Sequence, residues 1–119
     1  MLEYIDMPQV KFIRNKEILK EKVNHKNNVV KEVILKNGEL PNLLQLARAK
    51  LLCGDKIEKH SHESMNEIFY VLSGELFVIE NNITTKVSSG DTFVVYAKQY
   101  HSIEAIKDTE LIYFNLDSN

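Results

Sequence analysis

Short β-branched runs separated by turn signals are the feature of this sequence that most constrains its fold. Turn residues of the Asn, Asp, Gly and Ser type lie at 37–38, 73–74, 81–82, 88–91 and 107–109. Turns at intervals of about eight to twelve residues are typical of all-β sandwiches and barrels. The sequence therefore predicts an all-β fold, and its 119 residues are the size of one domain.

Several segments between these turns have the composition of strands. They are residues 29–36, 43–52, 67–72, 75–80, 83–87, 92–96 and 111–116. Segment 43–52 contains good helix formers, but turns frame it and it leads directly into Gly54, so we expect a strand. Near the N-terminus, residues 1–13 alternate loosely and predict short strands. Residues 15–23 have apolar residues at helical spacing and predict a short helix.

The stretch from Gly54 to Gly74 concentrates residues that bind metals. His60 and His62 are two apart, and residues two apart in a strand point to the same face. A turn over 63–66 would let Glu67 open the next strand and face back toward both imidazoles. Two imidazoles and one carboxylate leave open positions on a metal, as in iron oxygenases and other open catalytic sites.

This stretch resembles the first motif of the cupin family, G-x5-HxH-x4-E-x6-G. The motif residues stand at Gly54, His60, His62, Glu67 and Gly74. The resemblance implies a double-stranded β-helix, which is a jelly-roll barrel. It further implies a single cupin domain over 1–119, with a short N-terminal extension over 1–28 and the conserved barrel over 43–116.

The second cupin motif, G-x5-P-x-G-x2-H-x3-N, is only partly present. Gly90 and His101 are in place, which makes His101 the expected fourth ligand. Tyr96, Lys98 and Ala105 stand where the motif has Pro, Gly and Asn. We therefore expect the loop before His101 to take a different turn.

The resemblance implies that His60, His62, Glu67 and His101 hold one divalent transition metal ion. Fe, Mn, Ni, Zn and Co all suit such a ligand set. The expected function is that of a small metal-dependent enzyme acting on a small oxygenated metabolite, by isomerase, lyase or dioxygenase type chemistry. The alternative is a non-catalytic module that binds or senses a metal or metabolite.

Further residues are candidates for contacting the substrate. Phe69 shares the parity of the metal-binding carboxylate, so we expect it on the interior wall. Gln45 and Arg48 lie on opposite faces of the expected strand 43–52, and whichever face points inward supplies a substrate contact. Tyr96 and Tyr100 flank the altered second motif and are candidate catalytic acids or bases.

Composition narrows the choice of partners and location. The net charge is −2 and lysines are interspersed with acids, so a nucleic-acid partner is not expected. No apolar stretch approaches the length of a membrane span, and the first residues do not resemble a signal peptide. The single cysteine, Cys53, excludes an internal disulfide, so we expect a cytoplasmic protein. Apolar residues at 4–5 and 10–13 need a cover, which predicts a homodimer.

Overall fold

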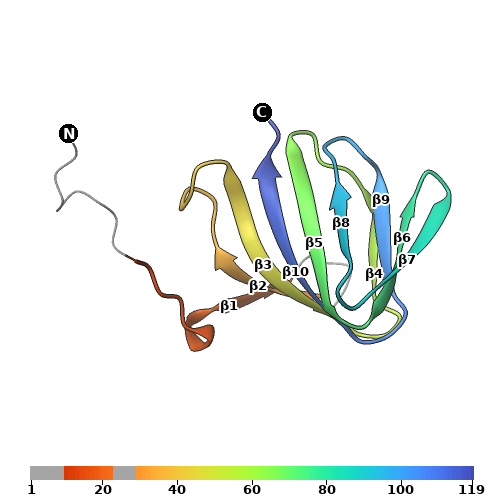
Figure 1. Ribbon diagram of the computed structural model, residues 1–119, viewed down its shortest axis with the longest axis horizontal. Coiled ribbons are helices and arrows are strands. Elements are labelled where there is room, and N and C mark those ends of the chain that lie inside the picture. Colours follow the sequence, from red (N-terminus) through yellow and green to blue (C-terminus); the bar gives the residue numbers. More distant parts are fainter. Residues whose placement is uncertain (1–9, 23–28) are drawn as a thin grey trace.

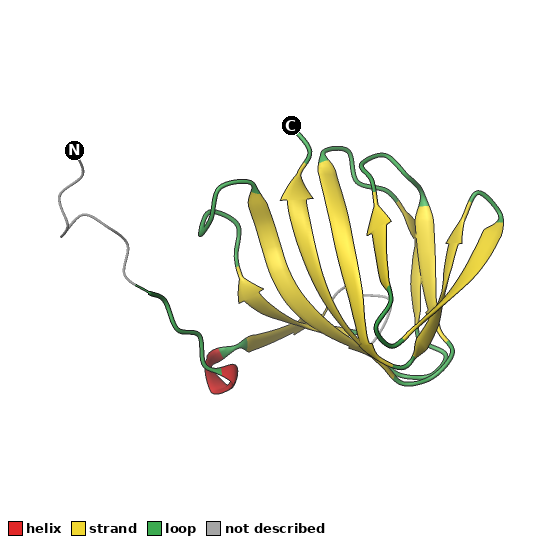
Figure 2. Cartoon of the chain, viewed as in Figure 1, coloured by secondary structure: helices red, strands yellow, loops and turns green. Residues whose placement is uncertain are grey.

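The computed structural model describes residues 10–22 and 29–119 and consists almost entirely of antiparallel strands (Figure 2). One short 3₁₀ helix, η2 (Asn15–Glu17), precedes the first strand. The strands are β1 (Leu19–Lys22), β2 (Val30–Leu35), β3 (Leu43–Leu51), β4 (Lys56–His60), β5 (Met65–Ser73), β6 (Glu75–Glu80), β7 (Ile83–Ser88), β8 (Thr92–Val95), β9 (His101–Ala105) and β10 (Thr109–Asp117). The predicted all-β fold is confirmed.

The strands form two sheets that pack face to face (Figure 1). The six-stranded sheet has the order β1-β2-β3-β10-β5-β8, and the four-stranded sheet has the order β4-β9-β6-β7. Neighbouring strands are antiparallel, and many of them are far apart in sequence, as β10 is from β3. This arrangement is that of a jelly-roll barrel.

Both sheets contribute to one hydrophobic core. Leu51, Val71 and Leu111 from the six-stranded sheet, and Leu76 and Ile103 from the four-stranded sheet, are almost fully buried. Buried and partly exposed positions alternate along β10, as expected for a strand with one face on the core. The barrel interior is therefore continuous between the two sheets.

Segment 43–52 is a strand, β3, despite its helical propensity. It lies between β2 and β10, so both of its edges are hydrogen-bonded. Its odd-numbered residues point inward, and the small residues Ala47 and Ala49 are buried. Tertiary pairing thus overrides local propensity here.

The helix predicted over 15–23 is wrong for the residues that the structure describes. Helical geometry ends after one turn at Glu17, and the chain continues as strand β1. Leu19 pairs with Val33 and Lys22 with Val30, so β2 satisfies the backbone of this segment. A short helix is only marginally stable by itself, whereas the strand is stabilised by its hydrogen bonds to β2.

Two further local predictions need correction. Residues 10–13 form no strand, and residues 1–9 lie outside the described part of the chain. The turn predicted over 63–66 ends sooner, because β5 already begins at Met65. No helix among the described residues is long and apolar enough to span a membrane.

Candidate metal centre

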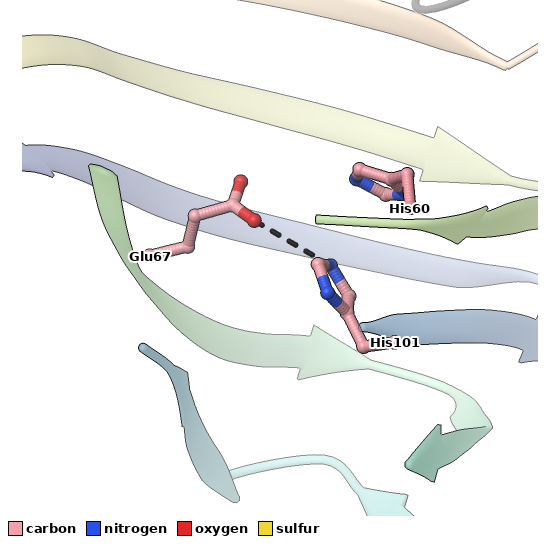
Figure 3. A group of neighbouring side chains, drawn as sticks. All are labelled: His60, Glu67 and His101. Carbon is pink, nitrogen blue, oxygen red and sulfur yellow. Dashed lines mark ion pairs between the residues drawn. The ribbon is translucent and has the colours of Figure 1, made fainter. Parts of the chain in front are cut away.

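Three of the four expected ligands meet inside the barrel. His60 ends β4 and lies opposite His101, the first residue of β9, in the four-stranded sheet. Glu67 reaches toward both from β5 in the other sheet (Figure 3). One ligand atom from each of the three lies within 4.8 Å of the others. Residues that are distant in sequence therefore converge on one point.

Backbone carbonyls orient two of the imidazoles. His60 Nδ1 lies 2.8 Å from Glu58 O, and His101 Nδ1 lies 3.2 Å from Gln99 O. A carbonyl oxygen only accepts, so Nδ1 carries the hydrogen in each ring and Nε2 keeps its lone pair. Metal-binding histidines are commonly fixed in this way by a hydrogen bond from the other ring nitrogen.

The buried atoms at the centre of this group are unsatisfied. Glu67 is 6% exposed and His101 is 2% exposed. Glu67 Oε1 and His101 Nε2 lie 3.5 Å apart, yet neither has a hydrogen-bond partner among the described residues. Two acceptors facing each other in a buried site are costly unless a proton or a metal cation lies between them. The donor set therefore fits a divalent transition ion.

The electrostatics of the site without an ion agree with this geometry. Burial raises the pKa of Glu67 to about 7. Burial is also the main cause that lowers the pKa of His101 and of His62. The hydrogen bond to Gln99 O opposes this shift in the pKa of His101, whereas the neighbouring imidazoles add to it; His60 lowers the pKa of His62 further. A bound cation would lower the pKa of the Glu67 carboxyl group again, because a cation favours the charged carboxylate. Neutral imidazoles are already in the state that binds a metal.

His62 lies at the edge of this group. Its Nε2 is 3.3 Å from Glu67 Oε1, but its ring centroid is 6.2 Å from that of His101. The rings of His60 and His62 are 4.8 Å apart and nearly perpendicular. His62 follows β4 rather than belonging to it, so strand alternation does not align it with His60.

The loop before His101 keeps a tight turn despite the missing Pro and Gly. Lys98 stands at a φ of 70°, a conformation that glycine adopts most easily. Its N–H donates to His62 O at 2.6 Å, and the N–H of Gln99 donates to Tyr96 O at 3.2 Å. These bonds hold the loop against the first motif, and His101 remains buried beside Glu67.

A cavity of about 480 Å³ opens onto the group of ligands. This volume is within the usual range for small-molecule sites. Phe69 and Gln45 line it, as expected of wall residues. Arg48 does not line it, because it points to the opposite face of β3 and binds Glu32 Oε2 at 3.2 Å and Asn15 Oδ1 at 2.6 Å.

The two candidate tyrosines also lie away from the cavity wall. Tyr96 is 62% exposed and Tyr100 is 60% exposed. Lys59 Nζ, from a residue that lines the cavity, stands 5.6 Å from the centre of the Tyr100 ring. Neither tyrosine is among the residues that line the cavity.

The family model for the cupin domain matches residues 48–117, which include all four expected ligands. The chain belongs to the cupin family.

Relatives of this cupin are found among both curated proteins and solved structures. The oxalate-binding protein of Thermotoga maritima is 31% identical over 104 residues, covering 83% of this chain and 86% of that protein. A solved Thermotoga maritima structure, described as a predicted oxalate decarboxylase, is 26% identical with a TM-score of 0.81, covering 90% of this chain and 99% of that one. KdgF from a Halomonas species is 22% identical with a TM-score of 0.73, covering 89% and 94% of the two chains, and this likeness concerns the fold.

Sequence reasoning missed five polar residues that line the cavity of this cupin. They are Lys31 on β2, Glu58 and Lys59 on β4, and Tyr113 and Asn115 on β10. Burial raises the pKa of the Tyr113 phenol, and the Glu67 and Glu21 carboxylates raise it further. The sequence contained one indication of these residues. Tyr113 and Asn115 are two apart in the last strand, so they lie on the same face of it.

Proposed function

We propose that this cupin is a metal-dependent enzyme that acts on a small oxygenated metabolite. His60, His62, Glu67 and His101 would hold one divalent transition ion. The reaction is of the isomerase, lyase or dioxygenase type. A bound ion would supply Lewis acidity toward a substrate oxygen, or a site for dioxygen.

One observation carries this proposal. Glu67 Oε1 and His101 Nε2 are buried, face each other across 3.5 Å, and have no hydrogen-bond partner among the described residues. A purely structural carboxylate at this depth would be paired with a donor. The surrounding sheets hold both side chains in place although these two atoms lack hydrogen-bond partners. Unfavourable arrangements of this kind are concentrated at functional sites.

The residues of the chain divide the other tasks between them. The Glu58 and Gln99 carbonyls hold His60 and His101 in the tautomer that presents Nε2. Phe69 stacks against Phe93, with ring centroids 4.6 Å apart, and forms part of the apolar side of the cavity. Apolar neighbours strengthen the electrostatic interactions of a bound substrate with the polar groups of the site.

Removing both histidines of the first motif tests the metal site. In the double variant His60→Ala/His62→Ala, we expect metal affinity to fall at least about a hundredfold, because two of four ligands are lost. The measurement is bound metal per chain after loading with Mn(II), Fe(II) or Zn(II), determined by elemental analysis. Lys59→Gln is the matched control, since Lys59 adjoins His60 but is not among the proposed ligands. Full occupancy in the double variant would contradict the proposal.

A non-catalytic binding or sensing role is the second candidate. It is favoured by the relative from Thermotoga maritima that is called an oxalate-binding protein. The two roles differ in one experiment, in which metal-loaded protein is incubated with candidate oxygenated acids. Turnover supports the enzyme, whereas a rise in melting temperature without turnover supports the binder.

The assembly state and cellular setting are further proposals. Val10, Phe12 and Leu19 are exposed, which favours a homodimer that covers them. Sedimentation at the mass of a monomer at micromolar concentration would contradict the dimer. The cytoplasmic location remains a prediction from the single cysteine, Cys53.

A further inference from the structure

A row of polar side chains crosses the inner face of the six-stranded sheet, starting at the metal centre. Glu67 on β5 lies opposite Asn115 on β10, and Asn115 lies opposite Gln45 on β3. Lys31 on β2 extends the row, because its Nζ donates to Gln45 Oε1 at 3.0 Å. All four side chains line the same cavity. The row thus connects the metal ligands to a cation on another strand.

Asn115 is the member of this row whose hydrogen bonding is incomplete, apart from the ligand Glu67. Its side chain is 7% exposed, and Oδ1 has no partner among the described residues. Leaving a buried amide oxygen without a donor is costly. A bound molecule that offers a hydroxyl to Asn115 would remove this cost.

Lys31 has the charge and the donors to bind an anion. An ammonium group has three donors, and within the described part of the chain the contacts of Lys31 are Gln45 at 3.0 Å and Glu21 at 3.9 Å. The Glu21 side chain is half exposed, so water screens its attraction to Lys31. Lys31 itself is less exposed than Glu21 and faces the cavity.

The charge of the cavity wall also favours an anionic ligand. The wall carries two lysines and two glutamates, namely Lys31, Lys59, Glu58 and Glu67. A divalent ion bound at Glu67 would leave this wall with a net positive charge. The neighbouring Gln45 and Tyr113 add neutral hydrogen-bonding groups rather than further charge.

We propose that this row is a second subsite, and that the substrate class is small hydroxycarboxylates. Lys31 binds a carboxylate, Asn115 accepts a hydrogen bond from a hydroxyl, and the opposite end of the molecule lies at the metal centre. Two strand spacings separate Glu67 from Gln45, about 10 Å between their Cα atoms. We expect a two-carbon dicarboxylate such as oxalate to bind at the metal centre alone, because two other strands lie between Lys31 on β2 and Glu67 on β5. This inference rests on the proposed function and names its substrate class.

Binding of three dianions to the Mn(II)-loaded protein tests the subsite by calorimetry. Tartrate carries hydroxyls, succinate has the same carbon chain without them, and oxalate is short. We expect Lys31→Met to weaken tartrate and succinate about tenfold or more, because a hydrogen bond to a charged group is lost. We expect Asn115→Leu to weaken tartrate about three- to tenfold and succinate by less than about twofold. Oxalate affinity should change less than about twofold in both variants.

Controls separate the subsite from the metal centre. Lys50→Met removes a lysine from the exposed face of β3 and should leave all three affinities unchanged. Melting temperature and metal content establish that each variant is folded and loaded. Unchanged tartrate affinity in Lys31→Met and Asn115→Leu would overturn the subsite while the metal centre stands. Absence of tartrate binding by loaded wild-type protein at about 1 mM, the upper end of ordinary KM values, would also overturn it.

Failure of the proposed function gives a different result. Wild-type protein that takes up no Mn(II), Fe(II) or Zn(II) would overturn the metal-dependent enzyme. The subsite would then be tested separately, by measuring the affinity of this metal-free protein for tartrate. A loss of that binding in Lys31→Met supports the subsite, and an equal affinity in Lys31→Met overturns it.

Discussion

Replacing Glu67 by glutamine is expected to have opposite effects on metal binding and on stability. The variant loses the anionic ligand, so metal affinity should fall about a hundredfold or more. The metal-free variant should nevertheless be more stable than the metal-free wild type. Burial raises the pKa of Glu67 to about 7, which means that the fold disfavours the ionised carboxylate. Glutamine has a similar shape and no charge to bury.

The pH dependence of this stabilisation follows from linkage. A carboxyl whose pKa is raised in the folded state contributes most stability below its unfolded pKa, and the contribution is lost as pH rises through the folded value. Wild type and Glu67→Gln should therefore be equally stable near pH 4. The advantage of the variant should grow between pH 4.5 and 7 and reach up to about 3 kcal/mol above pH 7.

Urea unfolding in the presence of a chelator, at several pH values, measures this difference. Glu58→Gln is the matched control, because Glu58 lines the same cavity and does not join the group of ligands. Its stability and metal affinity should stay close to those of wild type. A Glu67→Gln protein that keeps its metal affinity, or that is less stable than wild type at pH 8 without metal, would contradict this account.

Replacing Gly74 by alanine should cause a large loss of stability for a purely structural reason. Gly74 has a φ of +95°, and a Cβ added there would lie 2.7 Å from Thr109 Cα and closer still to Asp108 O. These backbone atoms belong to the segment that leads into β10. Thr109 also donates from Oγ1 to Glu75 O at 3.1 Å, so this segment is fixed against the turn that joins β5 to β6. The clash cannot be relieved by moving a flexible side chain.

Gly38→Ala is a matched control for the backbone conformation alone. Gly38 has a φ of +96°, and a Cβ there would meet nothing within 4 Å. We expect Gly38→Ala to cost about 1–2 kcal/mol and Gly74→Ala about 3 kcal/mol or more, because only Gly74 adds steric overlap. Urea unfolding of both variants measures the difference. Equal losses would show that the close approach to Thr109 has no role.

The strand framework and the ligand types could be predicted because they depend on local patterns. Alternation placed Phe69 on the inner face with Glu67, and the structure buries both. The spacing between His60 and His62 indicated a shared site, although a strand of five residues ends at His60 and leaves His62 on the following loop. The helix predicted over 15–23 failed because β1 gains its hydrogen bonds from β2, a pairing that no local pattern indicates.

The inward face of β3 and the polar row could not be predicted from local patterns. Both depend on which strands become neighbours. Gln45 and Arg48 were equal candidates in the sequence, and only the pairing of β3 with β2 and β10 directs Gln45 into the cavity and Arg48 toward Glu32. Asn115 is an ordinary polar residue in the sequence. It becomes unusual once Glu67 and Gln45 flank it on neighbouring strands.

Anomalous diffraction from a crystal of the metal-loaded protein tests the central claim most directly. Data collected above the absorption edge of the loaded ion locate that ion without assumptions about its ligands. We predict one strong peak per chain, bounded by Glu67 Oε1, His101 Nε2 and His60. A loaded crystal with no peak there, or with its peak on surface carboxylates alone, would contradict the metal centre.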